Sequence, residues 1–151
     1  MAGAVTLSKF CQAGLPGLPG PGFAVILIKL LIMDHIELKK AATTWIEDWN
    51  TRDLDRIMEH YAEDVEFESP SVFDRWGHPD GKLKGKTALR EHFKKGLDLP
   101  PDSPFELIDI LAGVDGILVV YKQASGTIVA DYVVPDDNHK ALIVKVFAPI
   151  H

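Results

Sequence analysis

One carboxylate stands in an apolar stretch where it could exchange protons with a bound molecule. Asp131 alternates with Val129 and Val133 in "IVADYVV", so the three side chains share one face of a predicted strand. If that face lines a pocket, burial raises the pKa of the carboxyl group and suits it to general acid–base catalysis. The alternative is an Asp131 that faces solvent or pairs with a lysine.

Two more residues that could move protons lie in the segment "SVFDRWGHPDGKLK", residues 71–84. His78 could act near neutral pH, where imidazole changes its charge, and Asp74 is close to it in sequence. The segment is predicted to be a loop, and long loops in compact domains are often functional. We therefore name Asp131, His78 and Asp74 as candidate catalytic residues, with a solvated loop as the alternative for the last two.

Aromatic and aliphatic residues at regular spacing could line the pocket that such chemistry needs. Tyr61 and Ser69 could also orient a ligand through their hydroxyl groups; core packing for Tyr61 and a backbone-bonded hydroxyl for Ser69 are the alternatives. The residues that we expect to line the pocket are Trp45, Trp49, Tyr61, Phe67, Ser69, Phe73, Trp76, Phe93, Val129, Val133, Val144 and Val146.

Composition excludes several classes of function. The chain of 151 residues has a formal net charge of -6 and no basic run, which argues against nucleic-acid binding because phosphates require clustered Lys and Arg. A single cysteine, Cys11, rules out an internal disulfide framework. The sequence has no cofactor motif, and its six histidines lack the spacing of a metal site. We expect a cytoplasmic protein without metal or cofactor.

The first 32 residues differ from the rest of the chain. They contain no Asp or Glu, and "GLPGLPGPG" is followed by the apolar run "FAVILIKLLI", which is shorter than the ~20 residues of a membrane span. Our hypothesis is that Met33 is the natural start, so that residues 1–32 are an extension and residues 33–151 the domain. A membrane-associating or targeting tail and an added packing segment are the alternatives.

Hydrophobic periodicity predicts the elements that would position these residues. Helices are expected at about 34–49, over the apolar set Leu54 to Ala62, and from Gly85 to about Leu97. A strand is expected at 65–69, and four more follow at about 105–112, 117–124, 127–134 and 141–148. The order ααβαββββ indicates an α+β domain whose three helices cover one face of a curved antiparallel sheet. Such a sheet can leave an apolar cavity at its open end.

Residues 36–149 resemble the nuclear-transport-factor-2-like superfamily, and within it the SnoaL-like and ketosteroid-isomerase-like branch. The resemblance is carried by "WNTRDLDRIMEHYAEDVEFESP" and by the Gly-Lys-x-x-Leu-Arg pattern at 85–90. It implies a cone-shaped fold, a pocket between sheet and helices, and frequent dimers. Because the superfamily contains isomerases, cyclases, dehydratases, hydrolases and plain binding domains, it does not specify a reaction.

The isomerase positions of this branch are only partly kept. The resemblance puts Ser69 at the position of the carboxylate base, Trp45 at about that of the acidic tyrosine, and Asp131 at that of the second acid. Serine cannot accept the proton at neutral pH, and an indole N–H is not acidic. We therefore expect no steroid isomerase of the usual mechanism.

Together these observations predict a protein that binds a small, largely apolar molecule, such as a cyclic or polyketide-like metabolite. An isomerase or lyase acting by acid–base catalysis is one hypothesis, and a non-catalytic ligand-binding, dimerisation or protein-interaction domain is the other. We expect a homodimer through the outer sheet face, where Ile128, Ala130, Tyr132 and Val134 alternate. Neither nucleic acid nor firm membrane association is expected.

Overall fold

The computed structural model describes the backbone of residues 21–100 and 103–150, and side chains from residue 35 onward in those ranges. The chain divides into two compact units, residues 1–37 and 38–151, and the account below concerns the second. Most of the expected extension, residues 1–20, lies outside the described residues. The start at Met33 stays a prediction.

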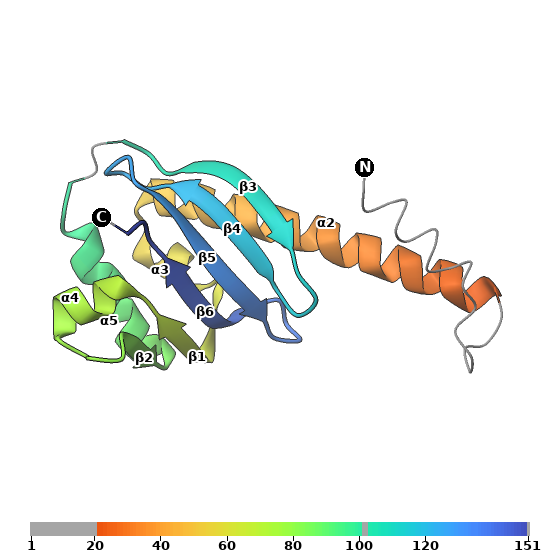
Figure 1. The fold of residues 1–151 in the computed structure, drawn as a ribbon, viewed down its shortest axis with the longest axis horizontal. Helices are drawn as coiled ribbons and strands as arrows, with labels where there is room; N and C mark the ends of the chain where they lie inside the picture. Colours follow the sequence, from red (N-terminus) through yellow and green to blue (C-terminus); the bar gives the residue numbers. More distant parts are fainter. Residues whose placement is uncertain (1–20, 101–102, 151) are drawn as a thin grey trace. The chain divides into compact units, whose positions relative to one another are not determined.

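Four helices and six strands are described, in the order shown in Figure 1. The helices are α2 (Pro21–Thr51), α3 (Leu54–Met58), α4 (Pro70–Trp76) and α5 (Lys86–Leu97). The strands are β1 (Tyr61–Glu68), β2 (Lys82–Lys84), β3 (Glu106–Ala112), β4 (Ile117–Lys122), β5 (Ile128–Pro135) and β6 (Ala141–Phe147). Within these ranges, no helix is both long enough and apolar enough to cross a membrane.

The α+β class is confirmed, but the sheet is mixed rather than antiparallel. Its strand order is β2-β1-β6-β5-β4-β3, and β1 pairs with β6 in parallel while the other neighbours are antiparallel. A parallel pair requires a long crossover, which here is the whole chain between the two strands. The sequence pattern identified both strands but carried no information about this long-range pairing.

The first two helices differ from their predicted bounds. The helix expected at 34–49 is part of the longer α2, and the second helix ends at Met58 rather than near Ala62. Asp53 caps α3 by accepting hydrogen bonds from the N–H groups of Asp55 (3.0 Å) and Arg56 (3.3 Å). Tyr61 is consequently the first residue of β1, which turns its side chain into the interior of the domain.

The expected loop at 71–84 contains two elements, so this prediction was wrong. Ser69 accepts a hydrogen bond from the N–H of Ser71 and caps α4, and Pro70 occupies the first turn, where its missing N–H has no cost. Gly77 ends the helix with φ 67°, a conformation that glycine adopts without strain. The short strand β2 then pairs with β1.

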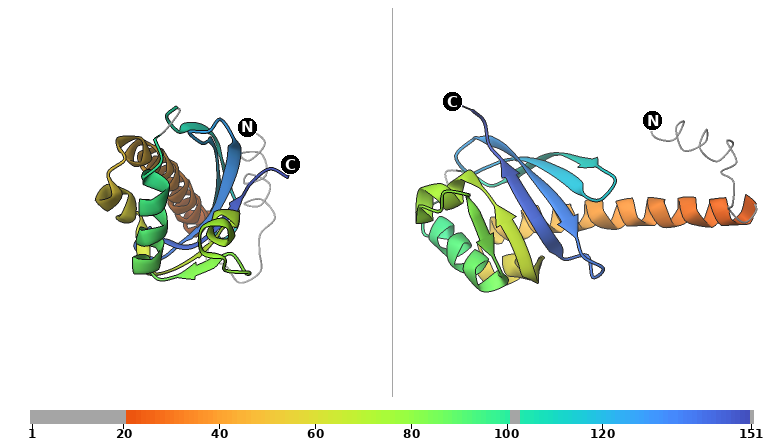
Figure 2. Two further views of the ribbon diagram at one scale, coloured as in Figure 1. Left: turned by 90° about the vertical axis from the view of Figure 1, so that its left-hand side faces the viewer. Right: turned by 60° about the horizontal axis from the view of Figure 1, so that its bottom comes forward.

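The helices α3 and α5, and α2 from residue 38 onward, lie on the concave side of the curved sheet, as the left view of Figure 2 shows. One group of buried side chains joins α3 and α5 to β1 and β6, and includes Ile57, Val65, Leu89 and Val144. A second group joins α2 to β4 and β5 through residues such as Ile46 and Val119. Burying these apolar faces against each other is the main force that fixes the helices on the sheet.

A buried carboxylate ties α2 to the segment that follows it. Asp48 on α2 accepts a hydrogen bond from Nε2 of His60, at 2.7 Å, just before β1. Its other carboxylate oxygen lies 3.0 Å from Nη2 of Arg56 on α3, an ion pair whose angles fall outside hydrogen-bond geometry. This contact holds the end of α2 in register with β1, where the next functional residues lie.

A substitution of Gly116, just before β4, tests how closely the backbones of β4 and β5 approach each other. A Cβ atom at this position would lie 2.3 Å from the carbonyl oxygen of Val133, and a backbone atom cannot move away alone. We expect Gly116→Ala to lower the free energy of unfolding by about 1–3 kcal/mol in urea titrations, as overpacking does. Val114→Ala, a change in the same turn at an exposed side chain, should cost less than about 0.5 kcal/mol. Equal stabilities of the two variants would contradict this account.

Candidate functional site

A cavity of about 420 Å³ lies between the helices and the sheet and opens toward the ends of α2 and α5. This volume is within the usual range of small-molecule sites. Its walls come from α2, β1, α4, α5, β4, β5, β6 and the segment that precedes β3. Residues far apart in the sequence therefore meet in one place.

Seven aromatic rings form much of the cavity wall. Their neighbouring centroids are 5.0–6.1 Å apart, mostly edge to face, which is a favourable geometry for aromatic pairs. Trp49 stacks on Phe105, at 5.3 Å and 17° between the rings. The seven are Trp45, Trp49, Tyr61, Phe67, Phe93, Phe105 and Tyr121. Such a wall presents flat, apolar surfaces against which a ring could pack.

Asp131 is the acidic residue among the described residues that line this cavity. It is buried, and its Oδ1 accepts a hydrogen bond from the Tyr121 hydroxyl at 3.2 Å. Burial raises the pKa of the Asp131 carboxyl group to about 7, although the hydrogen bond from Tyr121 opposes the shift. Near neutral pH the group therefore exists in both forms, and can either take up or give a proton.

Two indole groups lie close to a second phenol, Tyr61, near Asp131. Nε1 of Trp45 donates a hydrogen bond to the Tyr61 hydroxyl at 2.9 Å. Nε1 of Trp49 is buried without a hydrogen-bond partner, yet it is close enough to that hydroxyl to favour its ionised form. Burial and the charge of Asp131 outweigh both indoles and raise the pKa of Tyr61 above its usual value. Tyr61 is therefore a neutral hydrogen-bonding group throughout the physiological range.

Strand register places Ser69 and Asp131 on the two sides of one valine. On β6, Val146 is opposite Asp131 of β5, and Lys145 is opposite Glu68 of β1. Ser69 directly follows Glu68, so it continues the parallel register next to Val146, and all three residues line the cavity. With strands about 4.8 Å apart, the Cα atoms of Ser69 and Asp131 are roughly 10 Å from each other. A ligand with one or two rings could reach both.

A chain of hydrogen bonds runs away from Ser69 along the cavity wall. Ser69 Oγ lies 2.8 Å from Ser71 Oγ, which lies 3.0 Å from Nε2 of His92 on α5. Nε1 of Trp76 donates to Nδ1 of His92 at 3.1 Å. Burial, and then the charges of Arg75 and Lys95, lower the pKa of His92 to about 4, so the ring is neutral at pH 7.

The indole bond fixes the tautomer of His92. Because Nδ1 of the neutral ring accepts from Trp76, the ring proton must be on Nε2, which then donates to Ser71. The Ser71 and Ser69 hydroxyl groups share a hydrogen bond in which either can be the donor, and the Ser69 oxygen also accepts the Ser71 backbone N–H. When Ser71 is the donor, the hydroxyl hydrogen of Ser69 is free for the cavity that Ser69 lines. In that arrangement Ser69 can donate a hydrogen bond to a ligand.

A smaller, mostly apolar cavity of about 60 Å³ lies on the other side of Asp131. Trp45, Tyr61 and Asp131 line both cavities and separate them. The outer part of the small cavity is formed by residues including His60 and Pro135. Its volume is well below the usual range of small-molecule sites, so the large cavity is the better place for a ligand.

Most of the expected lining residues meet at the large cavity. Asp131 lies there together with Trp45, Trp49, Tyr61, Phe67, Ser69, Phe93 and Val146. Val133 and Val144 line the small cavity instead. Val129 is buried in the core beside them. These positions follow the alternation of β1, β5 and β6, whose inward faces the sequence pattern identified.

The other expected site residues lie elsewhere because their segment folds into α4 and β2. Asp74 and His78 are exposed, and Nδ1 of His78 lies 3.2 Å from the Lys82 carbonyl oxygen. Phe73 is 55% exposed. Trp76 lies behind His92, with the Lys95 ammonium group 3.6 Å from the centre of its ring. None of these four lines either cavity.

Among the described residues, no cluster of three or more His, Cys, Asp or Glu could hold a metal ion.

Several site residues were missed by reasoning from sequence. His92 follows Leu89 by three residues on α5, so a helical projection would have placed it on the buried face. Tyr121 alternates with Val119 on the inward face of β4. Ser71 and Arg75 were missed because α4 was predicted to be a loop. Arg52 carried no sequence signal, since its place at the cavity depends on the end of α2.

The comparisons with known proteins identify the family. The family model of the SnoaL-like domain matches residues 42–142. This chain belongs to the SnoaL-like family. A solved structure of a SnoaL-like protein of unknown function from Burkholderia thailandensis is 30% identical, with a TM-score of 0.71. That comparison covers 75% of this chain and 94% of the other. None of the curated proteins matches the sequence.

More distant structures share the fold of this SnoaL-like protein. An NTF2-like protein of unknown function from Burkholderia xenovorans LB400 is 14% identical, with a TM-score of 0.61 over 79% of this chain and 89% of the other. The epoxide hydrolase/cyclase-like enzyme SalBIII of salinomycin pyran-ring formation is 19% identical. Its TM-score is 0.58 over 78% of this chain and 94% of that enzyme. The expected superfamily is confirmed by the family model and by the Burkholderia thailandensis structure.

The raised pKa of Asp131 predicts a pH-dependent stability. Since the folded-state pKa of about 7 exceeds the ordinary value of 3.8, the unfolded chain loses this proton first and stability falls as pH rises from about 4 to 7. Asp131→Asn removes this effect and keeps an oxygen for Tyr121. We expect this variant to have a free energy of unfolding that is higher by on the order of 3 kcal/mol at pH 8. At pH 4 its free energy of unfolding should be close to that of the natural chain.

Urea unfolding of both proteins at pH 4, 6 and 8 checks this prediction. The effect of His92, which favours the unfolded state below pH 6.5, is common to both proteins and cancels in the difference. Asp64→Asn, at an exposed position of β1, is the control and should stay within about 0.5 kcal/mol of the natural chain. An Asp131→Asn difference that does not vary with pH would contradict the assignment.

Proposed function

We propose that this SnoaL-like protein binds a small, largely apolar ring compound in the large cavity and catalyses a proton transfer on it through Asp131. The observation that carries the proposal is a buried carboxyl group with a pKa of about 7 on the wall of an aromatic cavity. A base with this pKa is half ionised at neutral pH, which is close to optimal for general acid–base catalysis. An isomerase or lyase fits this chemistry.

The groups around Asp131 support the reaction class. The ionised carboxylate can remove a proton from a carbon next to a ligand carbonyl, which leaves an enolate. The hydroxyl hydrogen of Ser69, roughly 10 Å away across Val146, can donate to an oxygen atom at the other end of the ligand. The similarity to SalBIII, which is described as epoxide hydrolase/cyclase-like, supports ring-containing metabolites as ligands, although the identity is only 19%.

Exchange of α-protons for deuterium in 1-tetralone tests the proposal directly. This bicyclic ketone matches the size of the cavity, and its exchange in D2O is followed by proton NMR. We expect the protein to accelerate exchange, with a rate that rises as pH increases and levels off above about 7, because the ionised form of Asp131 is the base. Asp131→Asn should lower the enzymatic rate by about 100-fold or more.

Binding of 1-tetralone, measured by calorimetry, separates the alternatives. Binding without any acceleration, or with equal rates for the natural chain and Asp131→Asn, would contradict catalysis and favour a non-catalytic ligand-binding domain. Failure to bind this ketone or any other ring compound of similar size would contradict the ligand-binding function itself. Asp64→Asn, which leaves the cavity unchanged, is the control and should retain the natural rate.

We also propose that two copies associate through the outer face of the sheet. Ile128 and Phe147 are 52% and 58% exposed there, and Leu111 of β3 is 50% exposed. The register puts Ala130 opposite both Val120 and Phe147, so apolar side chains of β4, β5 and β6 are contiguous on this face. A twofold interface would bury the same face of each copy.

Light scattering coupled to size-exclusion chromatography checks the assembly. We expect a dimer in the natural chain and a monomer in the double variant Ile128→Asp and Phe147→Asp, because each carboxylate would be desolvated in the interface. Phe73→Asp adds a charge at an equally exposed aromatic residue of α4 and should stay dimeric. A natural chain that is monomeric at both low and high concentration would contradict the proposal.

A further inference from the structure

One part of the cavity wall carries hydrogen-bond donors and positive charge. Ser69, Ser71 and His92 are joined by the hydrogen bonds described above, and Arg75 of α4 lies against the same histidine. All four residues line the large cavity. Ser69 and His92 are 4% and 2% exposed, whereas Arg75 is at the open side. We refer to these four residues as the donor strip.

The guanidinium group of Arg75 has unused donors. Its Nη1 donates to the His92 carbonyl oxygen at 3.1 Å. Nη1 also lies 3.3 Å from Nε2 of His92, but Nε2 already carries the ring proton and donates to Ser71. A guanidinium group has five N–H donors, so most of those on Arg75 have no acceptor among the described residues and could bind a ligand.

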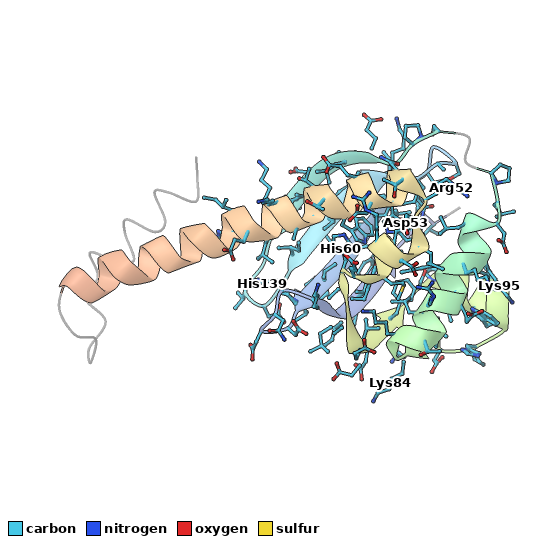
Figure 3. The ribbon with its side chains drawn as sticks, turned by 180° about the vertical axis from the view of Figure 1, so that it is seen from behind. Arg52, Asp53, His60, Lys84, Lys95 and His139 are labelled. Atoms are coloured by element: carbon cyan, nitrogen blue, oxygen red, sulfur yellow. The ribbon has the colours of Figure 1, made fainter. Side chains whose placement is uncertain are left out.

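A second arginine lines the same cavity. Arg52 follows α2 with φ 60° (Figure 3), and its Nη2 donates to the carbonyl oxygens of Leu97 and Leu99, the latter at 2.8 Å. Over the described ranges, neither Arg52 nor Arg75 forms an ion pair with a carboxylate. Two arginines that form no ion pair with a described carboxylate thus lie at one cavity, with Asp74 close enough to Arg75 to act on its charge.

Gly96 makes room for Arg75. A Cβ atom at position 96 would lie 3.1 Å from both Nη1 and Nη2 of Arg75, which is closer than ordinary packing. Glycine near the end of a helix costs up to about 1 kcal/mol relative to alanine. The absence of a side chain at this position allows the guanidinium group to lie over α5 at the cavity.

We propose that the ligand carries a carboxylate group, which binds at the donor strip through Arg75 and the Ser69 hydroxyl. The proposal rests on the proposed function, because it concerns the same cavity and the same ring compound. Guanidinium and carboxylate match in geometry and charge, and Ser69 supplies a hydrogen bond from the buried side. The ring then lies against the aromatic wall, with its far end toward Asp131. The substrate class is therefore a ring-containing carboxylic acid.

Two probes of nearly equal shape test this inference by calorimetry. In 2-naphthoate a carboxylate replaces the acetyl group of 2-acetonaphthone, and the ring system is the same. We expect the natural chain to bind 2-naphthoate at least about tenfold more tightly than the ketone, which corresponds to one charge-assisted hydrogen bond. Arg75→Met should remove most of this preference and leave the ketone affinity within about twofold.

Gly96→Ala provides a variant that keeps every polar group. Its methyl group would push the Arg75 guanidinium group aside by a few tenths of an ångström, while alanine favours the helix. We therefore expect 2-naphthoate binding to weaken relative to the ketone, together with equal or higher stability. A loss of binding with unchanged or increased stability cannot result from a damaged fold. Arg90→Met removes one positive charge at a distance from the cavity, where Arg90 pairs with Asp55, and should leave both affinities within about twofold.

The outcomes separate the two proposals. If the ketone binds but 2-naphthoate has no advantage, or if Arg75→Met weakens both probes equally, the carboxylate inference is wrong and the proposed function stands. An equal loss would mean that Arg75 only ties α4 to α5. If neither probe binds to the natural chain, the ligand-binding function fails as well. A loss of 2-naphthoate preference in Arg90→Met would show an effect of net charge and would also overturn the inference.

Discussion

The parallel pairing of β1 with β6 is the constraint on which the site depends. It closes a crossover that includes α4, α5 and four strands, and it places the end of β1 beside the end of β6. Ser69 and Asp131 thereby lie on the two sides of Val146. A shift of β1 by one residue would turn Ser69 away from the cavity and Glu68 into it, since side chains alternate along a strand.

Burial has opposite consequences for the pKa values of Asp131 and His92, two titratable groups in the interior of the site. It raises the pKa of Asp131 and lowers that of His92, because in each case a low-dielectric environment disfavours the charged form. Near neutral pH the interior therefore contains a partly protonated acid and a neutral imidazole. The positive charges lie at the more exposed positions, on Arg52 and Arg75, where water reduces the cost of the charge. The cavity thus combines a nearly neutral interior with a cationic opening.

Sequence reasoning recovered the elements whose patterns are local. The last four strands and α5 were predicted within one or two residues, since alternation and helical periodicity are visible in short windows. The parallel pairing was missed because strand patterns do not specify partners. The helix α4 was missed because its seven residues are too few to show periodicity, although Ser69, Pro70 and Gly77 in fact provide a cap, a first-turn proline and a terminating glycine.

The distinction between local sequence patterns and long-range contacts applies to the site as well. The alternation around Asp131 predicted an inward-facing carboxylate, and Asp131 is indeed buried on the cavity wall. The donor strip depends on the contact between α4 and α5, two elements whose relation only the folded chain shows. The contact between α4 and α5 also explains why Asp74 and His78 are not in the site. The face of α4 that carries Arg75 packs against α5, and Asp74 and His78 remain exposed to solvent. Reasoning from residue type alone favoured His78, in the predicted loop, over His92, on α5.

The two ends of the cavity are close enough to influence each other. At roughly 10 Å and an effective dielectric constant of about 20, two unit charges interact by about 1.7 kcal/mol, or a little more than one pKa unit. A ligand carboxylate without a counter-ion would raise the pKa of Asp131 further and leave less of the base ionised at pH 7. A guanidinium group beside that carboxylate forms a pair with little net charge, so the pKa of Asp131 stays near 7. An arginine beside the ligand carboxylate therefore permits an acidic substrate and proton abstraction in one cavity.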